Sequence, residues 1–100
     1  MVTRYFRADP LQGTVGTTRY ITITTAAAQL FTMNSGASGL FIYNLGTGSL
    51  LWGDSNISVN SGNYIFVNGG REWTQVQDSF SVYLRADSVS TLVAFTEYNV

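Results

Sequence analysis

The chain is built from short apolar runs that are separated at close intervals by glycine, asparagine and serine. β-Branched and aromatic residues dominate the runs between Gly39 and Gly70, which is typical of strands on a half-buried pleated sheet. The residues between the runs are typical of tight turns, because glycine and asparagine tolerate positive φ. The pattern predicts four strands here, at residues 40–43, 50–52, 57–59 and 64–67.

The segments on either side continue this pattern. Residues 18–25 alternate strictly, with Ile21 and Ile23 on one face and threonines on the other, which predicts a strand with one face toward a core. An alanine run at residues 26–29 is long enough for a single helical turn only. Further strands are predicted at residues 30–33, 73–77, 79–85 and 91–98, with a loop at 34–39 and a turn at 68–72.

Seven to nine closely spaced strands with no helix of consequence predict an all-β fold. We expect a small antiparallel β-sandwich or jelly-roll-like domain over residues 18–100. Residues 1–17 differ from the rest, since they hold Pro10, the chain's single proline. They are predicted to form an extended N-terminal arm, and a frayed terminus is the alternative. Aromatic and arginine residues favour a docking role, and the anchoring residues would be Arg4, Tyr5, Phe6 and Arg7.

Two of the predicted strands are apolar on both faces. In residues 40–43, Phe41 and Tyr43 lie opposite the aliphatic side chains, and residues 64–67 repeat the arrangement with Tyr64 and Phe66. A strand in a two-layer sandwich has one face to the core and one to water. These four aromatic residues are therefore predicted to contact the arm or a neighbouring subunit.

Composition makes an enzyme improbable. The chain has no cysteine and no histidine, which excludes disulfides, imidazole bases, Ser-His-Asp triads and the usual zinc sites. The acidic residues Glu72, Asp78, Asp87 and Glu97 show no spacing that pairs them for acid-base chemistry. We expect no catalytic residue and no cofactor.

Two further motifs have an alternative reading. Asp54 in the sequence Gly-Asp-Ser-Asn could contribute oxygen ligands to calcium, but calcium takes six to eight oxygens, and a turn is the better interpretation. No metal site is predicted. Trp52, Tyr64 and Trp73 lie near turns and could stack on sugar rings, although core or subunit-contact positions are favoured for them.

Charge limits the partners. Charged residues make up 11% of the chain, against about 25% in an ordinary domain, and the net charge is −1. A surface this poor in charge is weakly protected against contact between copies. Five arginines and no lysine provide no basic surface for nucleic acid. The apolar runs are far shorter than the ~20 residues that span a bilayer, so no membrane contact is expected.

From about Tyr20 to its end, the chain resembles small virion proteins of tailed bacteriophages, in particular capsid cement or decoration proteins and head-fibre-like β-domains. The resemblance rests on ITITTAAAQL, GLFIYNLGTGSLLWGDSNISVNSG, NGGREWTQV and FSVYLRADSVSTLVAFTEY. It covers roughly four-fifths of the chain and is a pattern of turns and strands, not a catalytic signature.

The resemblance implies a non-enzymatic capsid decoration protein, present in many copies on the virion after synthesis in the host cytoplasm. Its expected partners are other copies of itself, as a homotrimer, and the major capsid protein, whose subunits it would bridge. Two alternatives remain: a fibre or tip module that binds a glycan or receptor, and a small tail or neck component.

Overall fold

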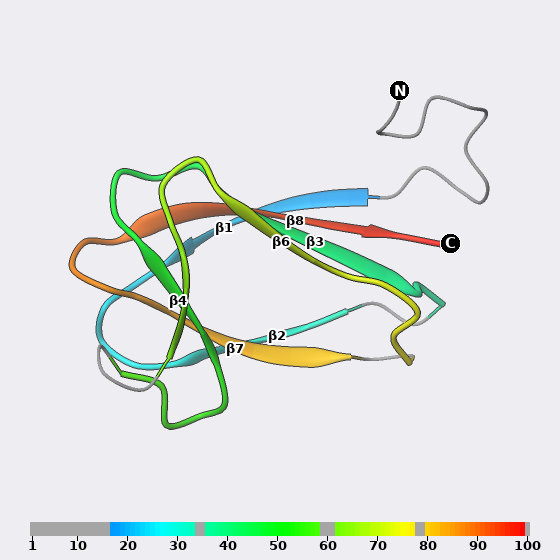
Figure 1. The fold of residues 1–100 in the computed structure, drawn as a ribbon, viewed down its shortest axis with the longest axis horizontal. Coiled ribbons are helices and arrows are strands. Elements are labelled where there is room, and N and C mark those ends of the chain that lie inside the picture. The colour runs from blue at the N-terminus through cyan, green and yellow to red at the C-terminus, as the bar shows by residue number, and fades with distance from the viewer. Residues whose placement is uncertain (1–16, 34–35, 59–61, 78–79, 100) are drawn as a thin grey trace.

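The computed structural model describes residues 17–33, 36–58, 62–77 and 80–99, and these residues form eight β-strands (Figure 1). None of the described residues lies in an α-helix. The strands are β1 (Thr17–Ile23), β2 (Gln29–Thr32), β3 (Gly39–Asn44), β4 (Leu50–Gly53), β5 (Asn63–Ile65), β6 (Gly70–Trp73), β7 (Ser81–Ala86) and β8 (Thr91–Tyr98).

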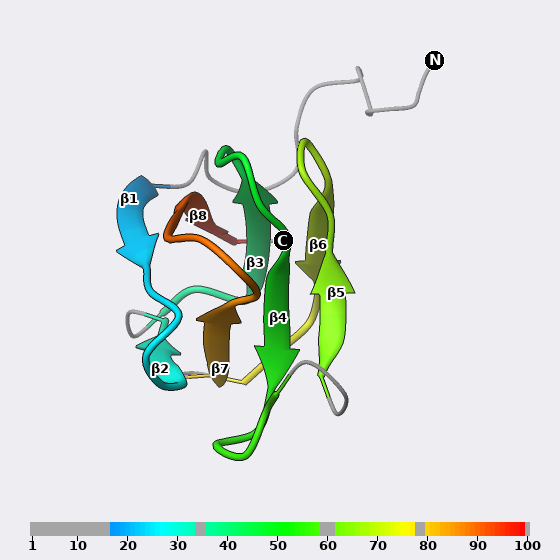
Figure 2. The same ribbon diagram turned by 90° about the vertical axis from the view of Figure 1, so that its left-hand side faces the viewer.

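The strands form two four-stranded antiparallel sheets packed face to face. Sheet A has the order β1-β8-β3-β6, and sheet B has the order β2-β7-β4-β5. Except between β4 and β5, the chain crosses from one sheet to the other at every connection, which is the strand order of a jelly roll. Figure 2 shows β1 and β2 along one side of the sandwich and β5 and β6 along the other. The predicted all-β sandwich is therefore confirmed.

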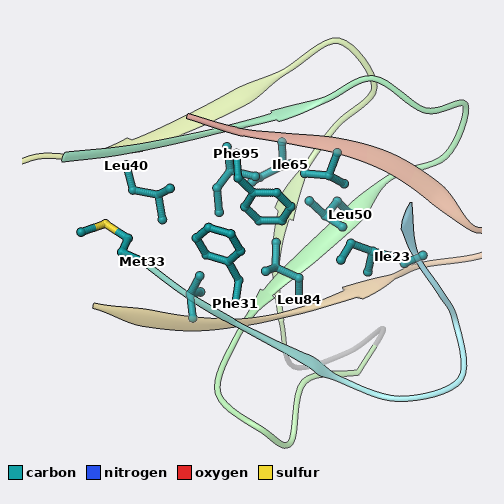
Figure 3. Packing of buried hydrophobic residues seen from close by; sticks show 12 residues of the cluster. Ile23, Phe31, Met33, Leu40, Leu50, Ile65, Leu84 and Phe95 are labelled. Carbon is teal, nitrogen blue, oxygen red and sulfur yellow. The ribbon is translucent and has the colours of Figure 1, made fainter. Parts of the chain in front are cut away.

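The core lies between the sheets and is formed by the alternate residues that point inward from each strand. Its centre is the stacked pair Phe31 and Phe95, one from each sheet, with ring centroids 4.1 Å apart. Figure 3 shows Met33 and Leu40 near one end of this cluster and Ile23 near the other. Period-two burial in β1 places Ile23 in the core and leaves Tyr20 outside, as the alternating sequence predicts.

The predicted strand at residues 57–59 is not a strand at Ile57 and Ser58, and Val59 lies outside the described residues. Ile57 is nevertheless buried, because it packs on the outer side of β4, where its side chain lies against Gly53. Leu51, which points to the same side, is buried as well. A short apolar run has the same sequence pattern whether it pairs in a sheet or covers its outer face, so this prediction was wrong.

Two turn positions also differ from the prediction. The chain turns at Phe66–Gly69, where the Gly69 amide donates to the Phe66 carbonyl (2.8 Å) and Asn68 has a φ of 61°. Strand β5 therefore ends at Ile65, and β6 begins at Gly70, inside the predicted turn. Backbone pairing with β3 tolerates the polar and glycine residues of this edge strand, whereas the predicted strand at residues 73–77 keeps only its first residue.

The alanine run does not form the predicted helical turn. Residues 25–27 form a bend between β1 and β2. The Thr24 carbonyl accepts a hydrogen bond from the Ala86 amide (2.9 Å), and the Thr24 amide donates to the Gln29 side chain (2.7 Å). These bonds to β7 and β2 replace helical ones, and so tertiary contacts outweigh the helix preference of alanine.

Candidate interaction surface

One end of the sandwich is organised around Asn44, the last residue of β3, which is completely buried. Its side-chain amide donates to the carbonyls of Gly48 (2.9 Å) and Ile65 (3.1 Å), and its side-chain oxygen accepts from the Gly46 amide (2.9 Å). Both donors and the acceptor are therefore satisfied, as buried polar groups require. This one side chain ties the β3–β4 connection to the end of β5.

Backbone hydrogen bonds extend the connection to the neighbouring loops. The Asn44 amide donates to Gly69 (2.9 Å), and the Asn44 carbonyl accepts from Asn68 (3.1 Å), which fixes the β5–β6 turn. The Leu45 amide donates to Leu92 (2.9 Å) and the Asp87 amide donates to Ser49 (3.0 Å), which fixes the β7–β8 loop. The loops at this end are thus held together through their backbones.

Four loops lie at this end, toward the left of Figure 1: residues 24–28, 45–49, 66–69 and 87–90. Eight large apolar side chains are exposed among the described residues, and five of them lie at this end of the sandwich. They are Leu45 (43% exposed), Phe66 (66%), Val67 (42%), Val89 (45%) and Leu92 (42%). We call the surface formed by these five residues the apolar end. The four loops contain one charged residue, the half-buried Asp87. This end of the molecule therefore presents apolar side chains on a nearly uncharged, hydrogen-bonded base.

The aromatic residues predicted to form a subunit interface lie at two separate places. Phe41 and Tyr43 point outward from the middle of sheet A, are half-buried, and have ring centroids 6.1 Å apart. Part of their cover comes from the same chain, since a Cβ on Gly70 would lie 2.5 Å from the Phe41 ring. Glycine at this position in β6 therefore lets the ring lie across the neighbouring strand.

Tyr64 and Phe66 lie instead on and just beyond the edge strand β5. Their rings are parallel, with an interplanar angle of 1° and centroids 5.6 Å apart, and both are exposed. Phe66 belongs to the apolar end. The structure therefore does not bring the four predicted contact residues together, and the second pair is more exposed to solvent than the first.

Trp52 and Trp73, for which sugar stacking is the alternative to a core or subunit-contact position, meet between β4 and β6. Their rings are perpendicular, with centroids 5.1 Å apart, and the Arg71 guanidinium lies 5.1 Å from each centroid. Both rings are half-buried and pack against the core. Because Arg71 is placed over both indoles, they form a cation–π cluster and do not offer an open, flat surface.

A second arginine closes the opposite side of the sandwich. Arg19 of β1 lies 4.5 Å above the ring of Phe31, pairs with the buried carboxylate of Glu97, and donates to the Thr32 carbonyl (3.2 Å). It thus connects the edge strand of sheet A to the edge strand of sheet B. Glu97 is therefore a structural ion-pair partner.

Tyr98 crosses the outer face of sheet A in the same way as Phe41. Its ring lies over Gly39 of β3, where a Cβ would approach it to 2.5 Å, and its hydroxyl donates to the Glu72 carboxylate on β6. Burial, together with this carboxylate, raises the pKa of Tyr98 well above its ordinary value. The hydroxyl is therefore held protonated as a donor that connects β8 to β6.

The remaining acidic residues are dispersed over the described ranges. No group of three or more acidic residues there could hold a metal ion. The Asp54 carboxylate accepts from the Asn56 amide (2.9 Å), and the Asp54 carbonyl accepts from the Ile57 amide (3.2 Å), so Gly-Asp-Ser-Asn is a turn. Asp87 lies in the β7–β8 loop, and Asp78 is outside the described residues.

Sequence reasoning missed Asn44 and Arg71. An Asn-x-Gly sequence after an apolar strand is a recognisable sign of a side chain that bonds two residues ahead, as Asn44 does with Gly46. No local signal announces the position of Arg71 over two tryptophans, because Trp52 lies in the other sheet. The predicted anchor residues Arg4, Tyr5, Phe6 and Arg7 lie outside the described residues.

In the ranges that the structure covers, there is no helix with the length and hydrophobicity to cross a membrane. No protein-family model, curated protein or solved structure matches this chain.

Proposed function

We propose that this chain is a non-enzymatic structural protein of a bacteriophage virion, a decoration protein that forms oligomers and bridges subunits of the major capsid protein. The observation that carries the proposal is the apolar end: four exposed apolar side chains on three of its loops and a fifth, Leu92, at the start of β8, with one charged residue in the four loops there. Exposed apolar surface gathered in one place marks an interaction site. A protein with such a surface and little charge is suited to assembly.

The mechanism we propose is cumulative burial. Apolar surface contributes roughly 25 cal/mol for each Å² removed from water, and a standard interface buries about 1,600 Å² in total. Repeated over a shell, many moderate contacts of this kind would hold capsid subunits together without any single strong bond. The proposed oligomer is a trimer, and the proposed capsid anchor is Arg4, Tyr5, Phe6 and Arg7, in the arm at residues 1–17.

The test measures binding to shells assembled from a tailed-phage major capsid protein alone. We expect the full chain to sediment with the shells, and a chain without residues 1–16 to remain folded and oligomeric but to stay in the supernatant. The quadruple variant Arg4→Ala, Tyr5→Ala, Phe6→Ala and Arg7→Ala should behave like the deletion. If neither the full chain nor the shortened chain sediments with any shell tested, the proposal is wrong.

A second candidate, a glycan-binding fibre module, is favoured by one observation. The parallel rings of Tyr64 and Phe66 are exposed and offer apolar faces of the kind that stack on planar apolar surfaces. A glycan array separates the two proposals, with Phe66→Ala to remove the exposed ring and Trp73→Ala to remove an indole of the cation–π cluster. Binding that is lost in Phe66→Ala would favour the fibre module over the decoration protein.

A further inference from the structure

We propose that the apolar end is the surface through which copies of this chain associate with one another. This inference rests on the proposed structural function and specifies the face used for self-association. The occupant is a second copy, not a different partner, and three features of the described residues support it.

The first feature is the charge of the surface. The four loops at the apolar end carry one charged side chain, Asp87, which is half-buried. Two copies can therefore bring these loops together without juxtaposing several like charges, a contact that would be costly. The charges at these loops are one of each sign, Asp87 and the Arg85 guanidinium that donates to the Thr25 carbonyl (3.0 Å), so a strongly acidic or basic partner would find little complementary charge here. A copy of the same apolar surface matches it. Closed oligomers are commonly built from such self-complementary surfaces.

The second feature is rigidity. Asn44 and the backbone bonds around it fix the loops that carry Leu45 and Phe66 before any partner arrives, and Leu92 is held in strand β8. Side chains on a fixed base lose less conformational entropy on association, so more of the burial energy remains as affinity. An exposed apolar side chain on a loose loop would not have this advantage.

The third feature concerns the edge strands of the two sheets. Copies could also associate by pairing an edge strand of one with an edge strand of another, and each edge of this sandwich has a feature that opposes such pairing. The edge strands of sheet A, β1 and β6, each carry an arginine whose guanidinium lies over aromatic rings within the sandwich. The edge strands of sheet B, β2 and β5, have four and three residues. Inward charges and short edge strands are both devices that prevent edge-to-edge pairing. Association is therefore left to side-chain surfaces.

The surface proposed for self-association and the start of β1, which the proposed capsid anchor precedes, lie at opposite ends of the sandwich. Strand β1 begins beside the end of β8, at the Thr17–Glu97 pair, whereas the apolar end lies beyond the other end of these strands, at Ile23–Thr91. Copies that meet through the apolar end would keep Thr17, where residues 1–16 join the sandwich, away from the contact. The proposed anchor would then remain available for the capsid.

The experiment measures the mass of the full chain in solution by light scattering after size exclusion, over a wide range of protein concentration. We expect the measured mass to be that of two or more chains, each of 10.9 kDa. The double variant Phe66→Glu and Val89→Glu should give the mass of one chain, because each copy would then present added like charges to the next. The matched control is Leu30→Glu, since the exposure of Leu30 (55%) lies between those of Val89 and Phe66, and Leu30 points outward from β2 on sheet B and is not one of the five residues of the apolar end. The control should keep the oligomer.

A second measurement does not require a charged variant to fold. The chain has no cysteine, so one introduced cysteine gives an unambiguous cross-link. With a short bis-maleimide, Val67→Cys should give covalently joined copies at least tenfold more efficiently than Leu30→Cys. Equal cross-linking of the two, or an oligomer that survives the double glutamate variant, would overturn the inference.

The outcomes also separate this inference from the proposed function. A wild-type chain that is a monomer at every concentration overturns self-association through this surface. If the same monomer sediments with capsid shells, the decoration function is retained and does not require self-association. An oligomer that resists the glutamate variant but binds shells would likewise leave the function intact and place the contact elsewhere.

Discussion

Arg19 and Arg71 occupy the two ends of a single cross-strand row of sheet A. The row runs from Arg19 through Phe95 and Ile42 to Arg71, across all four strands of the sheet. Each guanidinium closes one side of the sandwich over aromatic rings. The row therefore joins an apolar centre to two charged ends, and this explains how a chain with few charges protects both edges of its longer sheet.

Replacing Arg19 tests the first of these ends. Arg19→Ala removes the partner of the buried Glu97 carboxylate, and we expect the free energy of unfolding to fall by about 2 kcal/mol. Urea unfolding at pH 7 measures this loss. Arg19→Ala with Glu97→Gln should cost less than the sum of the single changes, because the second change removes the buried negative charge that Arg19 neutralises. Strict additivity would show that the ion pair contributes nothing.

Replacing Arg71 tests the other charged end of the row in sheet A. Arg71→Met keeps much of the aliphatic stem but removes the cation over Trp52 and Trp73, and we expect a loss of about 1 kcal/mol. The chain's two tryptophans are these two, so tryptophan fluorescence reports directly on the cluster. In a Trp73→Leu background the same change should cost less. An unchanged emission spectrum and unchanged stability would show that Arg71 is solvated and does not contact the rings in solution.

Asn44 is expected to be the most sensitive polar position at the apolar end. Asn44→Ala removes the side-chain bonds to the Gly48 and Ile65 carbonyls and to the Gly46 amide, and leaves the Gly48 carbonyl with the longer bond from the Thr91 hydroxyl (3.4 Å). We expect it to lower the free energy of unfolding by about 3 kcal/mol. The control is Asn63→Ala, whose exposed side chain makes one long bond, of 3.3 Å, to Trp52. That change should stay within about 0.5 kcal/mol. Similar urea midpoints for the two variants would contradict the role of Asn44.

Much of the fold could be predicted from the sequence because period-two alternation is a strong signal. Residues 18–25 and 79–85 carry it, and β1 and β7 lie within or close to these ranges. The errors arose where distant contacts decide the conformation. Gly70 and Arg71 are assigned to a turn on local grounds, but pairing with Tyr43 and Ile42 of β3 makes them a strand.

The candidate surface was less accessible to sequence reasoning than the fold. The sequence predicts that Phe41 and Tyr43 need cover from the arm or from another subunit. The structure shows instead that both are half-buried and that β6 of the same sheet covers part of Phe41. Leu45, Val89 and Leu92 lie in or beside turns and carry no pattern of their own. They become one surface only because the strand order brings four connections to the same end. That order is a property of pairing between distant segments, which no local pattern contains.

The packing of Phe41 on Gly70 predicts that the cost of a side chain at position 70 depends on the residue at position 41. Gly70→Ala places a Cβ 2.5 Å from the Phe41 ring, so the ring must move, and we expect a loss of about 1–3 kcal/mol. In a Phe41→Leu background the ring is removed, and the new Cβ keeps a tight 3.2 Å contact with the Ile42 carbonyl oxygen. Because alanine in a strand is favoured over glycine by about 0.5–1 kcal/mol, the same substitution should cost much less in this background. Thermal or urea unfolding of the four chains measures both effects, and a loss of equal size in both backgrounds would refute the packing.

The bond between Tyr98 and Glu72 predicts how stability responds to alkaline pH. Burial and the Glu72 carboxylate raise the pKa of Tyr98 in the folded chain, whereas the unfolded chain has the ordinary value of about 10. Below that value the hydroxyl is protonated in both states, and its contribution to stability is complete. Above it the unfolded chain loses the proton first, so the free energy of unfolding must fall as the pH rises further.

Urea unfolding between pH 8 and pH 11.5 measures this dependence, and Tyr98→Phe separates it from the titration of the other tyrosines. The phenylalanine chain cannot donate to Glu72, so we expect it to be less stable than the wild type at pH 8. The difference between the two chains should shrink as the pH rises above about 10, because the wild type loses an advantage that the variant never had. A difference that stays constant to pH 11.5 would show that the hydroxyl titrates alike in the folded and unfolded states. The bond across sheet A would then contribute nothing to the alkaline response.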